Sequence, residues 1–151
     1  MISNGKPYCL EYNSRFGDPE AQVVLPLLET DLLSVMLACA GGTLGAIDIK
    51  WKNRAAACVV IASGGYPADY KTGYEINGIE SIAQEEDLYC YHAGTAFSGD
   101  KTKYITNGGR VLCVTAIGEN LPACIERARY GAALVGFKDA FYRKDIGLSC
   151  V

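Results

Sequence analysis

Residues 110–135, RVLCVTAIGENLPACIERARYGAALV, contain the pattern from which the fold can be predicted. The first part, RVLCVTAIG, is an apolar run between glycines and predicts a strand. The second part predicts a helix, because its apolar side chains recur at helical spacing. They form a stripe of Leu121, Ile125, Ala128 and Ala132. A strand followed by a helix indicates a domain of mixed α and β structure.

Other strand-like runs surround this stretch and alternate with turn chemistry. They are residues 55–63 (AAACVVIAS), 88–94 (LYCYHAG) and 103–109 (KYITNGG), with a turn region at 64–73 (GGYPADYKTG). Asn-Gly supplies the positive backbone angles of a tight turn, so TNGGR at 106–110 predicts a hairpin connection. AFYRKDIG at 140–147 predicts a short strand and a turn. We expect this part of the chain to be a compact α+β unit with a barrel-like sheet.

The start of the chain predicts a strand, a turn and a helix. Residues 7–13, PYCLEYN, alternate as a strand does, with Glu11 and Asn13 on the same face. Asp18 is a suitable N-cap and Pro19 a suitable first residue of a helix. We therefore expect a helix to begin here.

A second helix is predicted over residues 31–40, DLLSVMLACA. Pro26 should kink or shorten the helix before it. Thr30 or Asp31 can cap the second helix, and the glycine pair after it should end it.

The candidate domain boundary lies in residues 41–53, GGTLGAIDIKWKN, which change from glycine-rich to alternating polar and apolar. We expect residues 1–45 to end one domain and residues 46–151 to form the next.

Composition excludes several classes of function. The 151 residues contain 14 Lys and Arg against 17 Asp and Glu, without a basic run, which disfavours nucleic acid and anionic membranes as partners. Apolar runs such as residues 23–28 are far shorter than the roughly 20 residues that a membrane span needs. The first residues lack the pattern of a signal peptide. We expect a soluble cytoplasmic protein.

Seven cysteines are scattered without a CxxC pair, and His92 is the only histidine. This composition favours free thiols in a reducing compartment and disfavours a structural zinc site. His92 lies in a strand-like run, where a hydrogen-bonded structural role is more usual than catalysis. Arg110 has no role that the sequence assigns.

The segment EYNSRFGDPE, residues 11–20, carries the candidate chemistry. On a strand, Glu11 and Asn13 project about 7 Å apart, and their oxygens suit a hard cation such as Mg²⁺. Arg15 continues this face and offers a planar fork of donors to a phosphate or carboxylate. A solvated strand end is the alternative, and the spacing alone does not decide between the two.

A longer set of motifs resembles a known family. LEYNSRFGDPEAQ, LLETDLL, SGGYPADY, HAGT, TNGGRVLCVTA and YRKDIG occur in this order over nearly the whole chain. Together they resemble the C-terminal part of phosphoribosylamine-glycine ligase, also called glycinamide ribonucleotide synthetase, an ATP-grasp ligase. The resemblance implies a C-terminal portion of an ATP-grasp domain followed by the ligase's C-terminal domain.

The resemblance also implies a reaction in purine biosynthesis. Glycine is joined to 5-phosphoribosylamine with hydrolysis of ATP, through a glycyl phosphate. Glu11 and Asn13 are then ligands of Mg²⁺ or Mn²⁺, and Arg15 is a catalytic residue on the transferring phosphate. Asp18 and Pro19 are placed at the substrate pocket, although helix capping explains both equally well.

Arg143 and Lys144 are candidates for binding the ribose phosphate, since a doubly charged group calls for paired cations. A surface charge cluster with Asp145 is the alternative for these two residues.

The upstream parts of such a ligase, including its ATP lid and nucleotide-binding strands, do not match any part of this sequence. We therefore expect weak metal binding and no ligase activity from the isolated chain, because phosphoryl transfer needs groups on all sides of the phosphates. Two classes of function stay open. One is a piece of the enzyme that works with the missing N-terminal part, and the other is a non-catalytic binding module.

Overall fold

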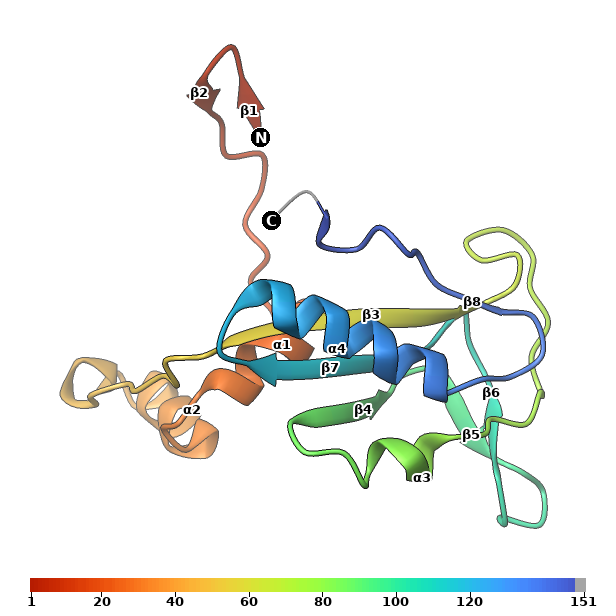
Figure 1. Cartoon of the computed structure of the whole chain (residues 1–151). Coiled ribbons are helices and arrows are strands. Elements are labelled where there is room, and N and C mark those ends of the chain that lie inside the picture. The colour runs from red at the N-terminus through yellow and green to blue at the C-terminus, as the bar shows by residue number, and fades with distance from the viewer. Residues whose placement is uncertain (149–151) are drawn as a thin grey trace.

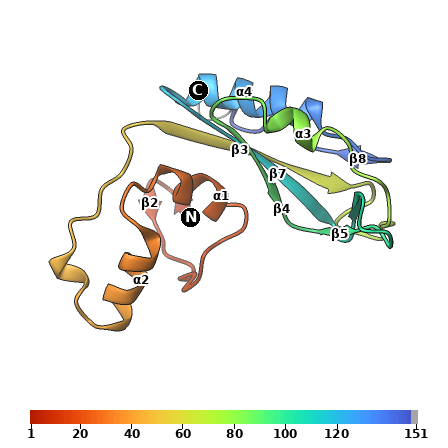
Figure 2. The same cartoon turned by 90° about the horizontal axis from the view of Figure 1, so that it is seen from below.

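The computed structural model describes residues 1–148. Its centre is a four-stranded sheet in the order β4-β7-β3-β8, with every neighbouring pair antiparallel. The strands are β3 (Ala55–Ser63), β4 (Leu88–His92), β7 (Arg110–Gly118) and β8 (Ala140–Phe141). Helix α4 (Leu121–Leu134) covers one face, together with the short α3 (Ile79–Ile82), while α1 (Ala21–Val24) lies against the other face (Figure 1, Figure 2).

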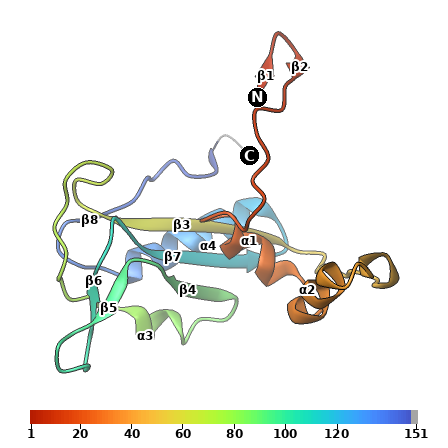
Figure 3. The same cartoon turned by 180° about the vertical axis from the view of Figure 1, so that it is seen from behind.

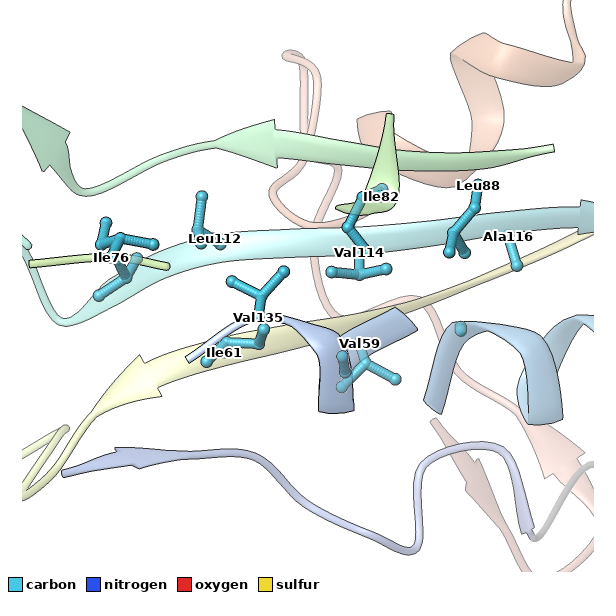
Figure 4. Close-up of a cluster of buried hydrophobic side chains, with 12 residues drawn as sticks. Val59, Ile61, Ile76, Ile82, Leu88, Leu112, Val114, Ala116 and Val135 are labelled. Carbon is cyan, nitrogen blue, oxygen red and sulfur yellow. The ribbon is translucent and has the colours of Figure 1, made fainter. Parts of the chain in front are cut away.

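The core lies between the sheet and α4. Val59 and Ile61 of β3 are buried and pair with Val114 and Leu112 of β7. Ala128 on α4 is fully buried against the same cluster (Figure 4 shows the cluster). Because side chains alternate across a strand, the intervening positions of β3 face the opposite side, toward α1.

The remaining elements project from this body. A small hairpin of β1 (Ile2–Ser3) and β2 (Lys6–Pro7) lies apart from the sheet, as Figure 3 shows. Helix α2 (Leu32–Ala40) extends away on the side of α1 (Figure 2). A separate ribbon pairs β5 (Thr95–Phe97) with β6 (Tyr104–Thr106).

Several predictions from the sequence are confirmed. The runs at 55–63 and 110–118 are the two long central strands, and residues 121–134 form the helix that follows. Asn120 caps this helix by accepting a hydrogen bond from the Ala123 amide. The mixed α and β character is therefore as expected.

The barrel-like expectation is not confirmed. Within residues 1–148 the four-stranded sheet stays open, with β4 and β8 at its edges. TNGGR at 106–110 does not join paired strands either, because β6 pairs with β5 while β7 pairs with β3 and β4. The turn chemistry is local, whereas strand pairing is decided by which apolar faces meet in the core.

The predicted strand at 7–13 is wrong. Only Lys6–Pro7 is paired as a strand, with Ile2–Ser3. Tyr8 still hydrogen bonds to Met1, and residues 9–16 belong to no strand. An apolar and polar alternation gives a stable strand only where a neighbour supplies hydrogen bonds. No strand of residues 1–148 lies beside this segment to do so.

The predicted start of the first helix is also wrong. Helix α1 begins at Ala21 with Glu20 at its N-cap position, and the bond between Asp18 and Pro19 is cis. The Asp18 carboxylate accepts a hydrogen bond from the Gln22 side chain instead of capping the helix. Asp18 and Pro19 therefore form a turn that precedes the helix.

The second helix is confirmed, with bounds Leu32–Ala40 and Asp31 as its N-cap. The Asp31 carboxylate accepts from the amide of Ser34 at 2.8 Å. Pro26 lies in a short 3₁₀ turn that ends the first helix, as its missing amide predicts. In the boundary segment, Trp51 forms an isolated antiparallel bridge with Leu28.

Burial differs between the two parts of the chain. Before β3, only Ala38 is buried among the described residues, whereas both apolar clusters lie after residue 54. Large apolar side chains stay exposed in the first part, among them Tyr8, Leu10, Tyr12, Phe16, Leu33, Leu37 and Trp51. The division at residue 45 stays a prediction. No helix within residues 1–148 combines the length and apolar character needed to cross a membrane.

Candidate functional site

The predicted metal ligands lie on the exposed extended segment before α1. Glu11 and Asn13 are both exposed, and their side chains make no hydrogen bond within residues 1–148. A carboxylate and an amide oxygen fit a Mg²⁺ ion that takes its other ligands from water and phosphate. Arg15 donates one hydrogen bond from Nη1 to the Phe16 carbonyl at 3.0 Å. No group of three or more His, Cys, Asp or Glu in the described part of the chain forms a metal cage.

A turn at Asp18 joins this segment to the sheet. Arg110 Nη1 donates to the main-chain oxygen of Asp18 at 2.7 Å, and Arg110 Nη2 lies 3.1 Å from its Oδ2. The other carboxylate oxygen of Asp18 accepts from Gln22 Nε2 at 2.8 Å. Asp18 is thus held from two directions.

A cavity of about 490 Å³ opens beside this turn, on the face of the sheet opposite to α4. Its lining is mostly apolar, with two arginines, and comprises Pro19, Cys58, Val60, Ala62, Tyr66, Pro67, Arg110, Phe141, Tyr142, Arg143 and Ile146. Two residues predicted at the substrate pocket, Pro19 and Arg143, therefore lie on the same cavity although they are far apart in the sequence. Arg110, which the sequence left without a role, lies there too.

Arg143 is already engaged by a neighbour. Its Nε donates to Asp145 Oδ1 at 2.9 Å, and its Nη2 donates to Oδ2 at 2.6 Å. This hydrogen bonding lowers the pKa of Asp145 and raises the pKa of Arg143. The alternative of a charge cluster with Asp145 is therefore present in the structure. Lys144 is exposed and does not line the cavity.

The cavity wall includes a thiol with altered acidity. Cys58 on β3 has a lowered pKa, chiefly because Cys113 on β7 hydrogen bonds to it. The pKa of Cys113 is raised by the same interaction and by burial. For Cys90, burial is the single cause of the shift, and it raises the pKa to about 11. Within one sheet, the pKa of Cys58 is therefore lowered while the pKa values of Cys90 and Cys113 are raised.

His92 has the structural surroundings that its sequence context suggests. Its Nδ1 lies 3.0 Å from the Thr95 hydroxyl, and its ring lies 4.5 Å from the ring of Tyr104. These contacts join the end of β4 to the ribbon of β5 and β6. His92 does not line the cavity beside Asp18.

Comparison with known proteins identifies the family of this chain. Residues 56–149 match the family model described as phosphoribosylglycinamide synthetase, C domain. The chain belongs to this family. The match covers the sheet, α4 and the cavity residues that follow β8, so the resemblance in the sequence is confirmed.

Individual relatives extend the match to the first residues. The chain is 45% identical to phosphoribosylamine-glycine ligase of Fusobacterium nucleatum, over 97% of this chain and 34% of the relative. It is 47% identical to the trifunctional purine biosynthetic protein adenosine-3 of Gallus gallus, over 100% of this chain and 15% of that protein. A crystal structure of phosphoribosylamine-glycine ligase from Thermotoga maritima matches 96% of the chain with a TM-score of 0.79 and 34% identity.

The chain spans about a third of the length of the single-function ligases that it matches. It corresponds to the C-terminal part of such a ligase. The exposed apolar side chains before β3 are consistent with a part of a larger body, because isolated domains rarely leave many such side chains uncovered.

Proposed function

We propose that this chain is the C-terminal part of a phosphoribosylamine-glycine ligase, which joins glycine to 5-phosphoribosylamine with conversion of ATP to ADP and phosphate. The observation that carries the proposal is the convergence of Pro19, Arg110 and Arg143 on one cavity in a chain of this family. The extended segment with Glu11, Asn13 and Arg15 leads directly to that cavity through Asp18.

The reaction has two bond-forming steps. A carboxylate oxygen of glycine attacks the terminal phosphorus of ATP, the bond to the bridging oxygen breaks, and ADP leaves. The amine nitrogen of phosphoribosylamine then attacks the acyl carbon, and the carbon–oxygen bond to phosphate breaks as the amine loses a proton. A Mg²⁺ ion, which Glu11 and Asn13 would hold, would supply positive charge to offset the negative charge of the phosphate oxygens.

Residues of this chain supply one side of the site. Glu11 and Asn13 would hold the metal ion through their oxygens, and Arg15 has further N–H donors for the transferring phosphate. Arg143 binds the ribose phosphate after exchanging Asp145 for the phosphate oxygens, with Lys144 adding positive charge. Val60 and its apolar neighbours give the cavity a wall of low polarity.

The upstream part of the ligase supplies the nucleotide cradle. Phosphoryl transfer depends on positioning and charge stabilisation from several directions, so the isolated chain should bind metal weakly and catalyse nothing. Strong formation of glycinamide ribonucleotide by the pure chain alone would contradict this.

A chimeric ligase tests the proposal. The upstream two thirds of the Fusobacterium nucleatum ligase are joined to this chain, and ATP-dependent formation of glycinamide ribonucleotide is measured. We expect activity, and a loss of about a hundredfold or more in kcat for Glu11→Gln, since the metal loses a charged ligand. Glu126→Gln, on the exposed face of α4, is the matched control and should retain activity.

The control joins the upstream two thirds of the Fusobacterium nucleatum ligase to its own C-terminal third at the same junction. Activity of this control would show that the junction is tolerated. An inactive chimera beside an active control would contradict the proposal and favour a non-catalytic binding module.

A further inference from the structure

Arg110 makes the long-range ion pair that connects the metal-binding segment to the sheet. Its guanidinium contacts both the main-chain oxygen and the carboxylate of Asp18. Asp18 follows Glu11, Asn13 and Arg15 in the chain, whereas Arg110 is the first residue of β7. The pair therefore joins the candidate metal site to the floor of the cavity.

The backbone that carries Arg110 is firmly held. The buried Ser63 donates from its hydroxyl to the Gly108 carbonyl at 2.8 Å and from its amide to the Gly109 carbonyl at 2.8 Å. The ring of Tyr66 packs so closely on Gly109 that a Cβ there would lie 2.1 Å from it. Arg110 thus projects from a fixed base toward the turn that precedes α1.

We propose that Arg110 is a positioning residue that holds the turn at Asp18 and Pro19 over the cavity and so orients Glu11, Asn13 and Arg15 toward the bound substrate. The catalytic consequence of this role rests on the proposed function. The Arg110 and Asp18 side chains are 40% and 43% exposed, so their ion pair adds little to global stability. Its effect should be local.

Amide hydrogen exchange on the chain itself tests the positioning. The reporters are the amides of Ala21 and Val24, which donate to Gly17 and Glu20 just after the turn. We expect Arg110→Gln to raise exchange in α1 by about tenfold, because the turn loses its anchor, while the amides of β3 and β7 keep their protection. Arg110→Lys keeps a cation within reach and should restore most of the protection.

Arg127→Gln is the matched control. Arg127 pairs with Glu85 at 2.7 Å and is also 40% exposed, but it lies on α4, on the other face of the sheet. It should leave α1 exchange unchanged. Unchanged α1 exchange in Arg110→Gln would overturn the proposal, as would a rise shared by β3, β7 and α4, which would mean a general loss of stability.

The chimeric ligase adds a catalytic readout. In an active chimera, Arg110→Gln should lower kcat by about tenfold, because reacting groups are misplaced, with the KM for ATP changed by less than about twofold. An unchanged kcat would overturn the proposal. If the unmodified chimera is inactive, the proposed function fails, and the exchange experiment still decides whether Arg110 fixes the turn.

Discussion

Arg143 is bound on two nitrogens by Asp145, its neighbour but one, at the mouth of the cavity where the ribose phosphate is proposed to bind. A phosphate that arrives there must replace a carboxylate that is already in place. The aspartate therefore competes with the proposed phosphate for the same nitrogens of Arg143.

Removing this competition should tighten anion binding. We expect Asp145→Asn to bind ribose 5-phosphate about three- to tenfold more tightly than the unmodified chain, since a charge-assisted competitor becomes a neutral one. Arg143→Gln should weaken binding by about tenfold or more, because the paired N–H donors are lost. Calorimetric titration measures both. Weaker binding in Asp145→Asn would mean that the ion pair builds the site rather than blocks it.

The fold was predictable where apolar periodicity was long and bounded by clear turn residues. The strand at 55–63 and the strand and helix at 110–135 follow from such patterns, and the helix buries Ile125, Ala128 and Ala132 of its predicted stripe. Residues 7–13 carry an equally regular alternation, yet residues 9–13 belong to no strand. Alternation reports which faces a strand could bury, but pairing requires a neighbouring strand, which local sequence does not specify.

The candidate site was predictable only in pieces. The chemistry of Arg143 and Pro19 was visible in the sequence, but their meeting on one cavity was not. Arg110 was missed because its partner, Asp18, lies on a distant segment and no local spacing links the two. Ion pairs between such segments depend on the tertiary fold, which brings Asp18 and Arg110 together.

Stability in acid should depend on Asp87. Arg54 hydrogen bonds to Asp87 and lowers its pKa below the ordinary value of 3.8. A lowered folded-state pKa contributes stability in full above 3.8, and this contribution is lost as pH falls through the folded-state value.

Urea unfolding of Asp87→Asn measures this contribution. The variant should be modestly less stable than the unmodified chain near neutrality, and the difference should vanish well below pH 3.8. Arg54→Gln removes the partner and should show the same convergence. A difference that persists in strong acid would mean that Asp87 acts through packing rather than charge.

Two half-buried thiols should differ in reactivity. Cys58 has a pKa lowered by Cys113, whereas burial raises the pKa of Cys90 to about 11. Because the thiolate is the nucleophile, iodoacetamide should modify Cys58 at least about tenfold faster than Cys90 near neutral pH. Peptide mass spectrometry over a time course gives both rates. Cys113→Ala should slow the reaction of Cys58, and equal rates for Cys58 and Cys90 would contradict this account.

Gly131 should be required for the packing of α4 on the sheet. A Cβ at this position would lie 2.7 Å from Val114 Cγ1 and 2.8 Å from Leu88 Cδ2, both in the buried core. Alanine favours a helix by up to about 1 kcal/mol over glycine, but overpacking a tight core costs about 1–3 kcal/mol. We expect Gly131→Ala to lower the free energy of unfolding by up to about 2 kcal/mol.

Urea unfolding checks this expectation, with Gly99→Ala as the control, since a Cβ at Gly99 meets nothing within 4 Å. The control should change stability by less than about 0.5 kcal/mol, as is usual for surface sites. If Gly131→Ala were the more stable protein, α4 would have moved away from β7 at little cost. The close approach of helix and sheet would then be a consequence of the glycine, and other residues of the core would determine how α4 is placed.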